Sequence, residues 1–174
     1  MPPILDTARL CLRPFSEADA PFVLELVNDA DWLTYIGDKA VRTLDDAKRY
    51  LLEGPMAMNA ELGIGLCAMD LKSPERRPLG MCGLLVREGS PDVELGYALL
   101  PEARGQGLVR EAAQAWVHHG FQTLNLRSIH AYTHAENTSS HAVLASLGFE
   151  LLAPSAEAEP GATRHHWLLR PDAA

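Results

Sequence analysis

The chain has 174 residues and a mass of 19.0 kDa, which is enough for one domain and short for two. Its composition, 47% hydrophobic and 22% charged, is typical of a folded globular protein and does not indicate intrinsic disorder. The net charge of −8 argues against nucleic acid or a membrane as a partner, because both attract basic surfaces, and mildly favours a cationic or amine partner. We expect one domain over residues 1–174.

The cysteines and the N-terminal residues both favour the cytoplasm. Cys11, Cys67 and Cys82 are widely spaced and form no Cys-x-x-Cys pair, which is typical of buried thiols in a reducing compartment. The N-terminal segment carries charges at Asp6 and Arg9, unlike a signal peptide. No apolar run reaches the roughly 18 residues that a membrane span requires.

The first third of the chain predicts one strand and two helices. Arg9–Arg13 alternates polar and apolar residues, as a half-buried strand does. A Ser-x-x-Asp box at Ser16 predicts one helix start, and a Thr-x-x-Asp box at Thr43 predicts another. Gly54-Pro55 then predicts the end of the second helix.

The rest of the chain alternates strands with helices. Three short apolar runs separated by turn residues predict antiparallel strands at Leu62–Leu71, Leu79–Arg87 and Asp92–Leu99. Further on, the patterns predict helices over Gly107–His119 and Thr138–Leu147, strands over Ser128–Thr133 and Thr163–Leu169, and a loop over Ala153–Gly161. The order predicts an α/β (α+β) fold, with about four helices flanking a mixed, mostly antiparallel central sheet of about six to seven strands.

The most informative segment opens the helix after the third of those strands. Arg104-Gly105-Gln106-Gly107 precedes that helix, and two glycines remove side-chain bulk so that a ligand can approach the backbone. The unpaired N–H groups of a first helical turn bind phosphate readily. The spacing lacks the third glycine of the dinucleotide fingerprint and the Gly-Lys-Ser/Thr ending of a P-loop. A glycine-containing loop without a ligand is an equal alternative on spacing alone.

These residues resemble a known cofactor-binding motif. Arg104-x-x-Gly107, following the strand residues Glu94-x-Gly96-Tyr97, resembles the acetyl-CoA-binding motif Arg/Gln-x-x-Gly-x-Gly/Ala of the GNAT superfamily of N-acetyltransferases. The last position departs, since Val109 stands where the family has Gly or Ala. A bulkier residue there is expected to narrow the pyrophosphate cradle.

The resemblance extends over nearly the whole chain, in the expected order. Leu5–Pro14 with Glu17–Asp19 resembles the opening of the RimJ/RimL-like branch, whose members include acetyltransferases of ribosomal-protein N-termini. Glu136-Asn137-x-x-Ser140, followed by Leu147-Gly148-Phe149, resembles a later part of the same branch. Each piece is weak alone, and the ordered set is specific.

The resemblance implies a GNAT-like sheet whose fourth and fifth strands splay apart, with acetyl-CoA in the gap. The backbone of Leu99 and Leu100 is then expected to bind the pantetheine arm, and Asn137 to contact it from the other side. Arg104 is expected to lie near the phosphates. The pyrophosphate is expected on the N–H groups of Gly105, Gln106, Gly107, Leu108, Val109 and Arg110. A splayed strand leaves unpaired amides that such a ligand satisfies.

Direct acetyl transfer to an amine needs a base and a donor for the departing thiolate. Glu94 is the first candidate base, acting through water, and the alternative is an exposed strand glutamate. His130 and His134 are the second candidates for the base. Both, together with Trp32, are also expected to contact the substrate, and a structural role is the alternative for each. Ser140 is the expected donor to the thiolate, although a hydroxyl near a helix start can bond the backbone instead.

The leading hypothesis is therefore an acetyl-CoA-dependent N-acetyltransferase that works in a ternary complex. Its acceptor is expected to be a protein N-terminus or a small amine, and the protein a monomer or a homodimer. A non-catalytic acyl-CoA-binding sensor or regulatory module is the alternative. The histidine spacings match no zinc motif, so no metal is expected.

Overall fold

The computed structural model describes residues 3–74, 77–152 and 164–171. Their centre is one eight-stranded sheet in the order β1-β2-β3-β4-β5-β6-β8-β7. The strands are β1 (Leu5–Asp6), β2 (Leu10–Arg13), β3 (Gly65–Leu71), β4 (Pro78–Val86), β5 (Val93–Leu99), β6 (Ile129–His134), β7 (Glu150–Leu151) and β8 (Arg164–Leu169). The β5–β6 pair is parallel and the other described pairs are antiparallel. The predicted fold class is confirmed.

The sheet has more strands than expected because it includes β1 and β7, which are only two residues long and were not predicted. Such short strands show no alternation of polar and apolar residues, so sequence patterns cannot indicate them. The loop predicted over Ala153–Gly161 lies outside the described residues.

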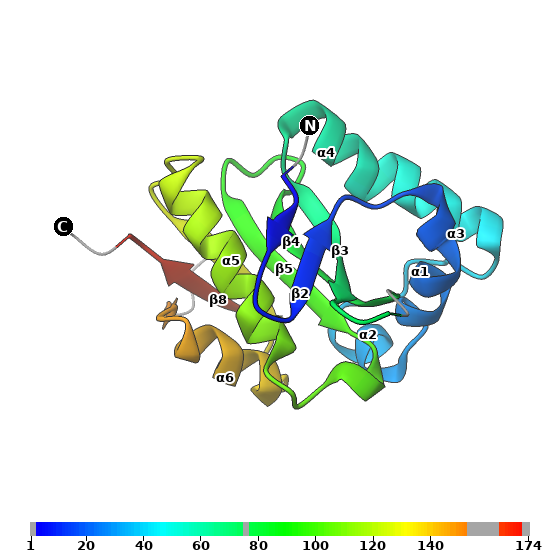
Figure 1. The fold of residues 1–174 in the computed structure, drawn as a ribbon. Helices are drawn as coiled ribbons and strands as arrows, with labels where there is room; N and C mark the ends of the chain where they lie inside the picture. Colours follow the sequence, from blue (N-terminus) through cyan, green and yellow to red (C-terminus); the bar gives the residue numbers. More distant parts are fainter. Residues whose placement is uncertain (1–2, 75–76, 153–163, 172–174) are drawn as a thin grey trace.

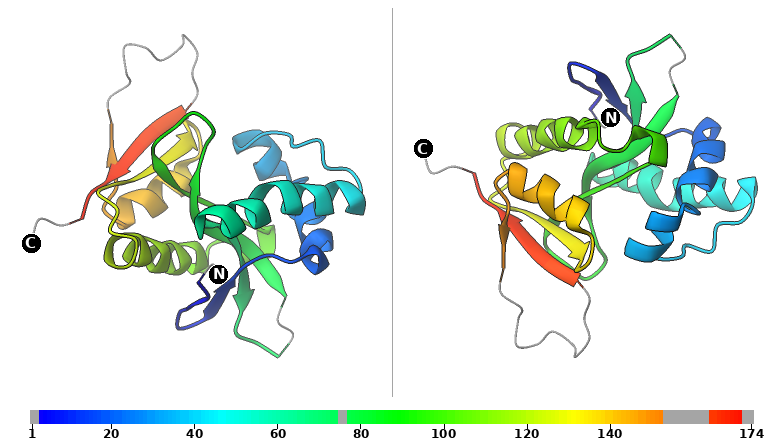
Figure 2. Two further views of the ribbon diagram at one scale, coloured as in Figure 1. Left: turned by 90° about the horizontal axis from the view of Figure 1, so that it is seen from above. Right: turned by 90° about the horizontal axis from the view of Figure 1, so that it is seen from below.

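Helices cover both faces of the sheet (Figures 1 and 2). The α-helices are α1 (Ala20–Leu26), α2 (Ala30–Tyr35), α3 (Leu44–Leu51), α4 (Ala57–Leu62), α5 (Leu108–Gln122) and α6 (Thr138–Ser146). One core packs α5 and α6 on the sheet, with Trp116 fully buried at its centre. A second core on the other face packs α1 and α3 around Leu26 and Leu51. Because β3 and β4 alternate their side chains, Cys67 and Cys82 point to the first core while Ala68 and Met81 enter the second.

The helix start at Ser16 is confirmed, but the predicted helix end at Gly54-Pro55 is wrong. Ser16 and Asp19 form a capping box that begins a short 3-10 turn, Glu17–Asp19, leading into α1. After α3 the chain continues through a single π-helical turn, Leu52–Met56, into α4. Pro55 has no N–H and its ring clashes with an α-helical carbonyl, so the wider π turn accommodates it without ending the helix.

The pairing between β5 and β6 determines where the site lies. The β5 and β6 strands are paired at a single position, Glu94 with His130. Beyond Glu94, the C-terminal half of β5 has lost its neighbour on that side, although β4 still pairs with it as far as Leu99. A gap therefore opens in the middle of the sheet, between the starts of α5 and α6.

Candidate active site

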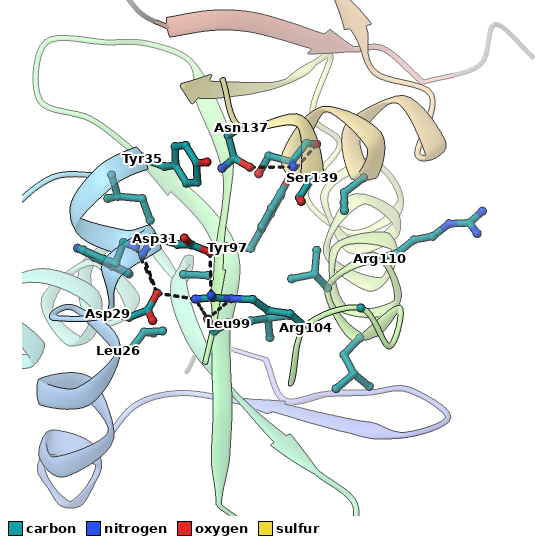
Figure 3. Close-up of a pocket in the computed structure, with 18 of the residues that line it drawn as sticks. Leu26, Asp29, Asp31, Tyr35, Tyr97, Leu99, Arg104, Arg110, Asn137 and Ser139 are labelled. Carbon is teal, nitrogen blue, oxygen red and sulfur yellow. Dashed lines mark hydrogen bonds and ion pairs between the residues drawn. The ribbon is translucent and has the colours of Figure 1, made fainter. Parts of the chain in front are cut away.

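A cavity of about 400 Å³ lies in the gap between β5 and α6 (Figure 3). We call it the larger cavity. Its walls come from α2, the second half of β5, the start of α5 and the start of α6. The residues that line it are Leu26, Asp29, Asp31, Trp32, Tyr35, Ile36, Tyr97, Ala98, Leu99, Arg104, Gly105, Gly107, Leu108, Val109, Arg110, Asn137, Thr138, Ser139, Ser140 and Val143.

One end of the larger cavity is built for an anion. Gly105 and Gly107 adopt φ of 73° and 74°, a left-handed conformation that favours glycine, and a Cβ on Gly105 would meet no atom within 4 Å. Gly107 is the N-cap of α5 and supplies no side-chain cap. The first intrahelical donor is the Glu111 N–H, which bonds the Gly107 carbonyl at 3.1 Å. The preceding N–H groups of α5 are therefore open to a phosphate, and the helix dipole adds to the attraction.

Arg104 lies beside this end, but carboxylates of the protein itself already pair with its guanidinium. Its guanidinium forms ion pairs with Asp29 and Asp31 of the α2 start, and it donates to the Leu99 carbonyl at 3.0 Å. Figure 3 shows these contacts and the Arg110 side chain directed away from them. Arg110 is exposed and has no ion pair within the described ranges, so it is the motif's available cation.

A second arginine braces the glycine loop from a distant part of the sequence. Arg9 donates from Nε to Glu111 at 2.6 Å and from Nη1 to the Gln106 carbonyl at 2.9 Å. Thr7 holds the other Glu111 carboxylate oxygen at 2.6 Å. Sequence reasoning did not single out Arg9 for this role, because its partners lie about one hundred residues away and no local pattern connects them.

Three of the predicted cofactor-binding residues direct little or none of their side chain into the larger cavity. Val109 is 8% exposed and packs mainly in the first core, so most of its bulk lies outside the larger cavity. Leu100 does not line the cavity: its N–H donates to the Leu79 carbonyl and its own carbonyl accepts from Ala103. Gln106 also lies outside the lining, with its side chain on the Glu102 carbonyl.

The start of α6 forms the opposite wall. Asn137 is its N-cap, and the side-chain Oδ1 accepts from the Ser140 N–H at 3.1 Å. This bond leaves the Asn137 amide NH₂ available to a ligand in the gap. The capping role that was an alternative for Ser140 therefore belongs to Asn137.

A smaller cavity of about 240 Å³ continues the gap toward β6. It shares part of its lining with the larger cavity: Trp32, Tyr35, Ile36, Tyr97, Asn137 and Ser140. The two cavities therefore adjoin, and a molecule in one can reach a molecule in the other at these residues. The smaller cavity is also lined by Lys39, Arg87, Glu94 and His134.

Glu94 lies in the wall of the smaller cavity and is almost wholly buried. The residue is only 3% exposed, so the alternative of an exposed strand glutamate is wrong. Oε2 accepts from Arg87 Nε at 2.7 Å, while the Arg87 side chain itself is 52% exposed. Among the described residues Oε1 has no partner, which leaves it for a water molecule or an amine.

Tyr97 and Ser140 meet where the two cavities adjoin. The Tyr97 hydroxyl donates to the Ser140 backbone carbonyl at 3.3 Å. Burial raises the pKa of Tyr97 well above its ordinary value, so this hydroxyl stays protonated. The Ser140 hydroxyl has no hydrogen-bond partner in the described part of the chain and is free to donate into the gap.

Of the three predicted substrate residues, the structure brings two to the site. Trp32 lines both cavities and His134 lines the smaller one, with its ring 5.6 Å from the Tyr35 ring. His130 lines neither cavity; its Nδ1 lies 2.8 Å from His166 Nε2, and its Nε2 lies 3.5 Å from Asp92. His130 therefore belongs to a histidine pair behind the cavity wall.

Within the described ranges, no cluster of three or more His, Cys, Asp or Glu side chains is arranged to hold a metal ion. Cys67 and Cys82 are buried register partners on β3 and β4, and burial raises the pKa of the Cys67 thiol to about 12. Neither thiol is a nucleophile at neutral pH, because the thiolate is the reactive form. No helix in these ranges is long and apolar enough to cross a membrane.

A sequence profile of the acetyltransferase (GNAT) domain matches residues 9–150. This chain belongs to the GNAT acetyltransferase family. Its relatives include the uncharacterized N-acetyltransferase YoaA of Bacillus subtilis, 26% identical over 151 residues that cover 85% of this chain and 83% of that protein. The enzyme class that follows is that of the N-acetyltransferases.

Solved structures of the family have the same fold. An acetyltransferase from Agrobacterium tumefaciens aligns with a TM-score of 0.82 and 27% identity, covering 98% of this chain and 96% of that one. RimL, a ribosomal L7/L12 α-N-protein acetyltransferase solved in complex with coenzyme A, aligns with a TM-score of 0.75. Its identity is 18%, with 99% of this chain and 98% of that chain covered, so the likeness shows the fold alone. The GNAT domain accounts for the splayed strands and for a glycine loop at the start of α5.

Proposed function

We propose that this GNAT protein transfers the acetyl group of acetyl-CoA to a primary amine in a ternary complex. The observation that carries the proposal is the pair of adjoining cavities. One ends at the uncapped start of α5 beside two left-handed glycines, and the other is walled by the buried carboxylate of Glu94. The first cavity offers backbone N–H groups to a polyanionic donor, and the second offers the Glu94 carboxylate as a base for an amine acceptor.

The residues of the larger cavity fit acetyl-CoA. The N–H groups from Gly107 to Arg110 would hold the pyrophosphate, with the Arg110 guanidinium nearby. The edge of β5 that β6 leaves unpaired would bind the pantetheine amides on one side, although the Leu99 carbonyl already accepts from Arg104, and the Asn137 amide would bind them on the other. Arg104 would shape the loop through Asp29 and Asp31 rather than contact phosphate. When bound, acetyl-CoA supplies an acetyl group activated as a thioester.

The smaller cavity would hold the acceptor amine. Glu94, through water at Oε1, takes one proton from the ammonium, because only the neutral amine has a free electron pair. The amine nitrogen then forms a C–N bond to the acetyl carbonyl carbon as the C–S bond breaks. Ser140 donates a hydrogen bond to the departing thiolate sulfur, which receives the second proton lost by nitrogen. The balance is one ammonium and one thioester giving one amide, one thiol and one proton.

Structural neighbours bear on the type of acceptor. They include RimL, a ribosomal L7/L12 α-N-protein acetyltransferase, and a ribosomal-protein-S5-alanine acetyltransferase from Vibrio fischeri, both named for protein acceptors. At 18% and 22% identity they share the fold with this chain, and we include a protein N-terminus among the acceptors to be tested because this fold works on protein acceptors in those neighbours. A small amine of the same chemistry fits the 240 Å³ of the smaller cavity, which is below the volume of about 300 Å³ where drug-sized pockets begin.

Thermal unfolding tests the donor site. Acetyl-CoA at about 100 times its Kd should add about 2.7 kcal/mol to the free energy of unfolding and raise Tm by roughly 5–10 °C. Gly107→Val should abolish this shift, because a β-branched residue strains the left-handed backbone of the loop and its side chain would crowd Arg9, which braces that loop. Calorimetry with and without acetyl-CoA measures both effects.

Gly89→Val is the matched control. Gly89 has φ of 77° and open space around its Cβ position, but it lies in the β4–β5 turn away from the cavity. It should lose similar stability and keep the full acetyl-CoA shift. A shift that survives in Gly107→Val would contradict the pyrophosphate site. A shift in the parent protein without thiol release for any amine would leave a binding module and no transferase.

A further inference from the structure

The charges that line the smaller cavity are mostly positive. Lys39 and Arg87 line it as cations, and Glu94 is its one carboxylate among the described residues. This arrangement is unexpected in a chain whose net charge is −8. The chain as a whole has more acidic than basic residues, whereas the lining of this cavity has more basic than acidic ones.

Glu94 does not compensate both cations. Its Oε2 already accepts from Arg87 Nε at 2.7 Å, so these two groups neutralise one another. Lys39 has no ion-pair partner within the described ranges. The nearest acidic neighbour in sequence, Asp38, is paired with Arg42. One positive charge at the cavity is therefore left over.

A third cation adjoins the same rim. Arg164 is the first residue of β8 and pairs in register with His134, which lines the smaller cavity. Burial lowers the pKa of Lys39, and the nearby charges of Arg87 and Arg164 lower it further. Lys39, Arg87 and Arg164 are all exposed, so water screens most of their mutual repulsion, and Lys39 is the one of the two cavity-lining cations whose charge no carboxylate of the described residues offsets.

We propose that the acceptor is a primary amine on a short apolar skeleton that also carries a carboxylate or a phosphate. The inference rests on the proposed function and names the substrate class of its acceptor site. The anion lies between Lys39 and Arg87 at the rim, and the amine reaches inward toward Glu94 Oε1 and the Ser140 hydroxyl. The skeleton packs on the apolar part of the wall, where Trp32 is 5% and Met81 1% exposed.

Physical reasoning favours such a bifunctional acceptor over a simple amine. A lone cationic amine would be repelled by the unpaired charge of Lys39, whereas the Arg87 charge is already offset by Glu94. Because Lys39 is exposed, this repulsion weakens as the ionic strength rises. An amine with an anion on the same molecule carries no net positive charge and gains an ion pair at the rim. Free amino acids, aminoalkyl phosphates and peptides that begin with an acidic segment share this chemistry.

Matched acceptor pairs test the proposal by thiol release with acetyl-CoA. The pairs are leucine with leucinamide, phosphoethanolamine with ethanolamine, and the peptide Ala-Glu-Ala-Gly with Ala-Gln-Ala-Gly. The anionic member of at least one pair should have a kcat/KM about tenfold higher or more, mainly through KM. The pair that responds most strongly identifies a free small molecule or a peptide as the source of the anion.

Lys39→Gln should reduce that preference about three- to tenfold by raising KM, and Lys39→Glu should reverse it. Lys48→Gln, an exposed lysine of α3 that lines neither cavity, should leave the preference unchanged. Calorimetric titration of the same acceptors into the protein saturated with CoA supplies a readout that does not need turnover, and there too the anionic members should bind tighter.

Equal or better use of the neutral amines would overturn the inference while leaving the acetyltransferase function intact. Unchanged discrimination in Lys39→Glu would overturn it as well. If no member of the panel binds or reacts although acetyl-CoA raises Tm, the inference fails and so does the proposed transfer. If acetyl-CoA has no effect on Tm, the failure lies in the donor site, so the two failures are distinguishable.

Discussion

Glu94 and Ser140 illustrate how single residues obtain chemistry from their surroundings. Both are common side chains, but Glu94 is buried with one carboxylate oxygen bonded to Arg87, and Ser140 is anchored by its N–H to Asn137. The Glu94 side chain is thus held by one bond with its other oxygen free, and the Ser140 backbone is held by one bond with its hydroxyl free for the gap. Pre-positioned polar groups of this kind lower a barrier without reorganising during the reaction.

Substitution at these two residues should lower turnover without weakening donor binding. Glu94→Gln should reduce kcat by about 10²- to 10⁴-fold, because Gln keeps the bond to Arg87 but cannot accept a proton. Ser140→Ala should reduce kcat by about tenfold or more, because the thiolate loses a hydrogen-bond donor. Steady-state kinetics and the acetyl-CoA-induced rise in Tm measure the two effects separately.

Neighbouring residues provide the controls for this pair. Glu88→Gln changes an exposed carboxylate just beyond the end of β4, and Ser139→Ala changes an exposed hydroxyl that lines only the larger cavity. Both should keep kcat within a factor of two or so. An unchanged kcat for Glu94→Gln at every pH would rule out its role as the base, and the same result for Ser140→Ala would rule out its role as the donor.

At the scale of elements, α2 connects the two halves of the site. It is only six residues long, and its start is held by the Arg104 ion pairs with Asp29 and Asp31. Trp32 in its first turn and Tyr35 at its end lie in the walls of both cavities. Helices this short are unstable alone, so the tertiary contacts at its start determine where its aromatic side chains lie.

The N-cap of α2 is therefore a sensitive position. Asp29→Ala should lower the free energy of unfolding by about 1–2 kcal/mol, because it removes the cap and the more buried of the two Arg104 partners. It should also raise KM for the acceptor, since Trp32 and Tyr35 lose their fixed positions. Urea unfolding and acceptor kinetics measure both.

Asp31→Ala is the comparison for Asp29→Ala. Its side chain is 56% exposed, and exposed ion pairs contribute little to stability. It should change the free energy of unfolding by less than about 0.5 kcal/mol. Equal losses in the two variants would mean that the cap does not hold α2 in place.

At the scale of the whole molecule, a buried ion-pair network joins the sheet to α1. Arg13 on β2 donates to Asp19 at 2.8 Å and to Asp70 of β3 at 2.7 Å, and both carboxylates are 6% exposed. Burial alone raises the pKa of Asp19, but the bonds from Arg13 and Ser16 outweigh it and lower that pKa below its ordinary value. Asp19 is thus ionised in the folded protein at neutral pH.

This network predicts the pH dependence of stability. A carboxylate with a lowered pKa contributes its full stabilisation above the unfolded value of 3.8, and the contribution is lost as the pH falls from there through the folded value. Arg13→Met should lower the free energy of unfolding by about 3–5 kcal/mol at pH 7, because two buried carboxylates lose their partner.

Chemical unfolding between pH 3 and pH 7 tests the sign of both effects. The parent protein should lose stability as the pH falls toward 3, whereas Arg13→Met should gain stability as its buried carboxylates take up protons. Arg42→Met, which breaks an exposed pair with Asp38, should follow the parent curve. Parallel curves for the parent and Arg13→Met would contradict the network's role.

The local sequence determined the order of the helices and strands, and also the caps and turns that depend on neighbouring residues. The capping boxes at Ser16 and Thr43, the glycine loop before α5 and the cap at Asn137 each depend on residues within a few positions of one another. Such signals act through the backbone next to them, so they can be interpreted along the chain. The resemblance to the GNAT family added the splayed strands that local rules do not predict.

Only the tertiary structure decided which charges meet. The pairing of Arg104 with Asp29, of Arg9 with Glu111 and the convergence of Lys39 on Arg87 join segments separated by many tens of residues. The net charge of −8 indicated a cationic partner, yet the folded chain gathers cations around the smaller cavity. Composition sums charges over the chain, whereas a ligand responds to the few that lie within a Debye length of its site.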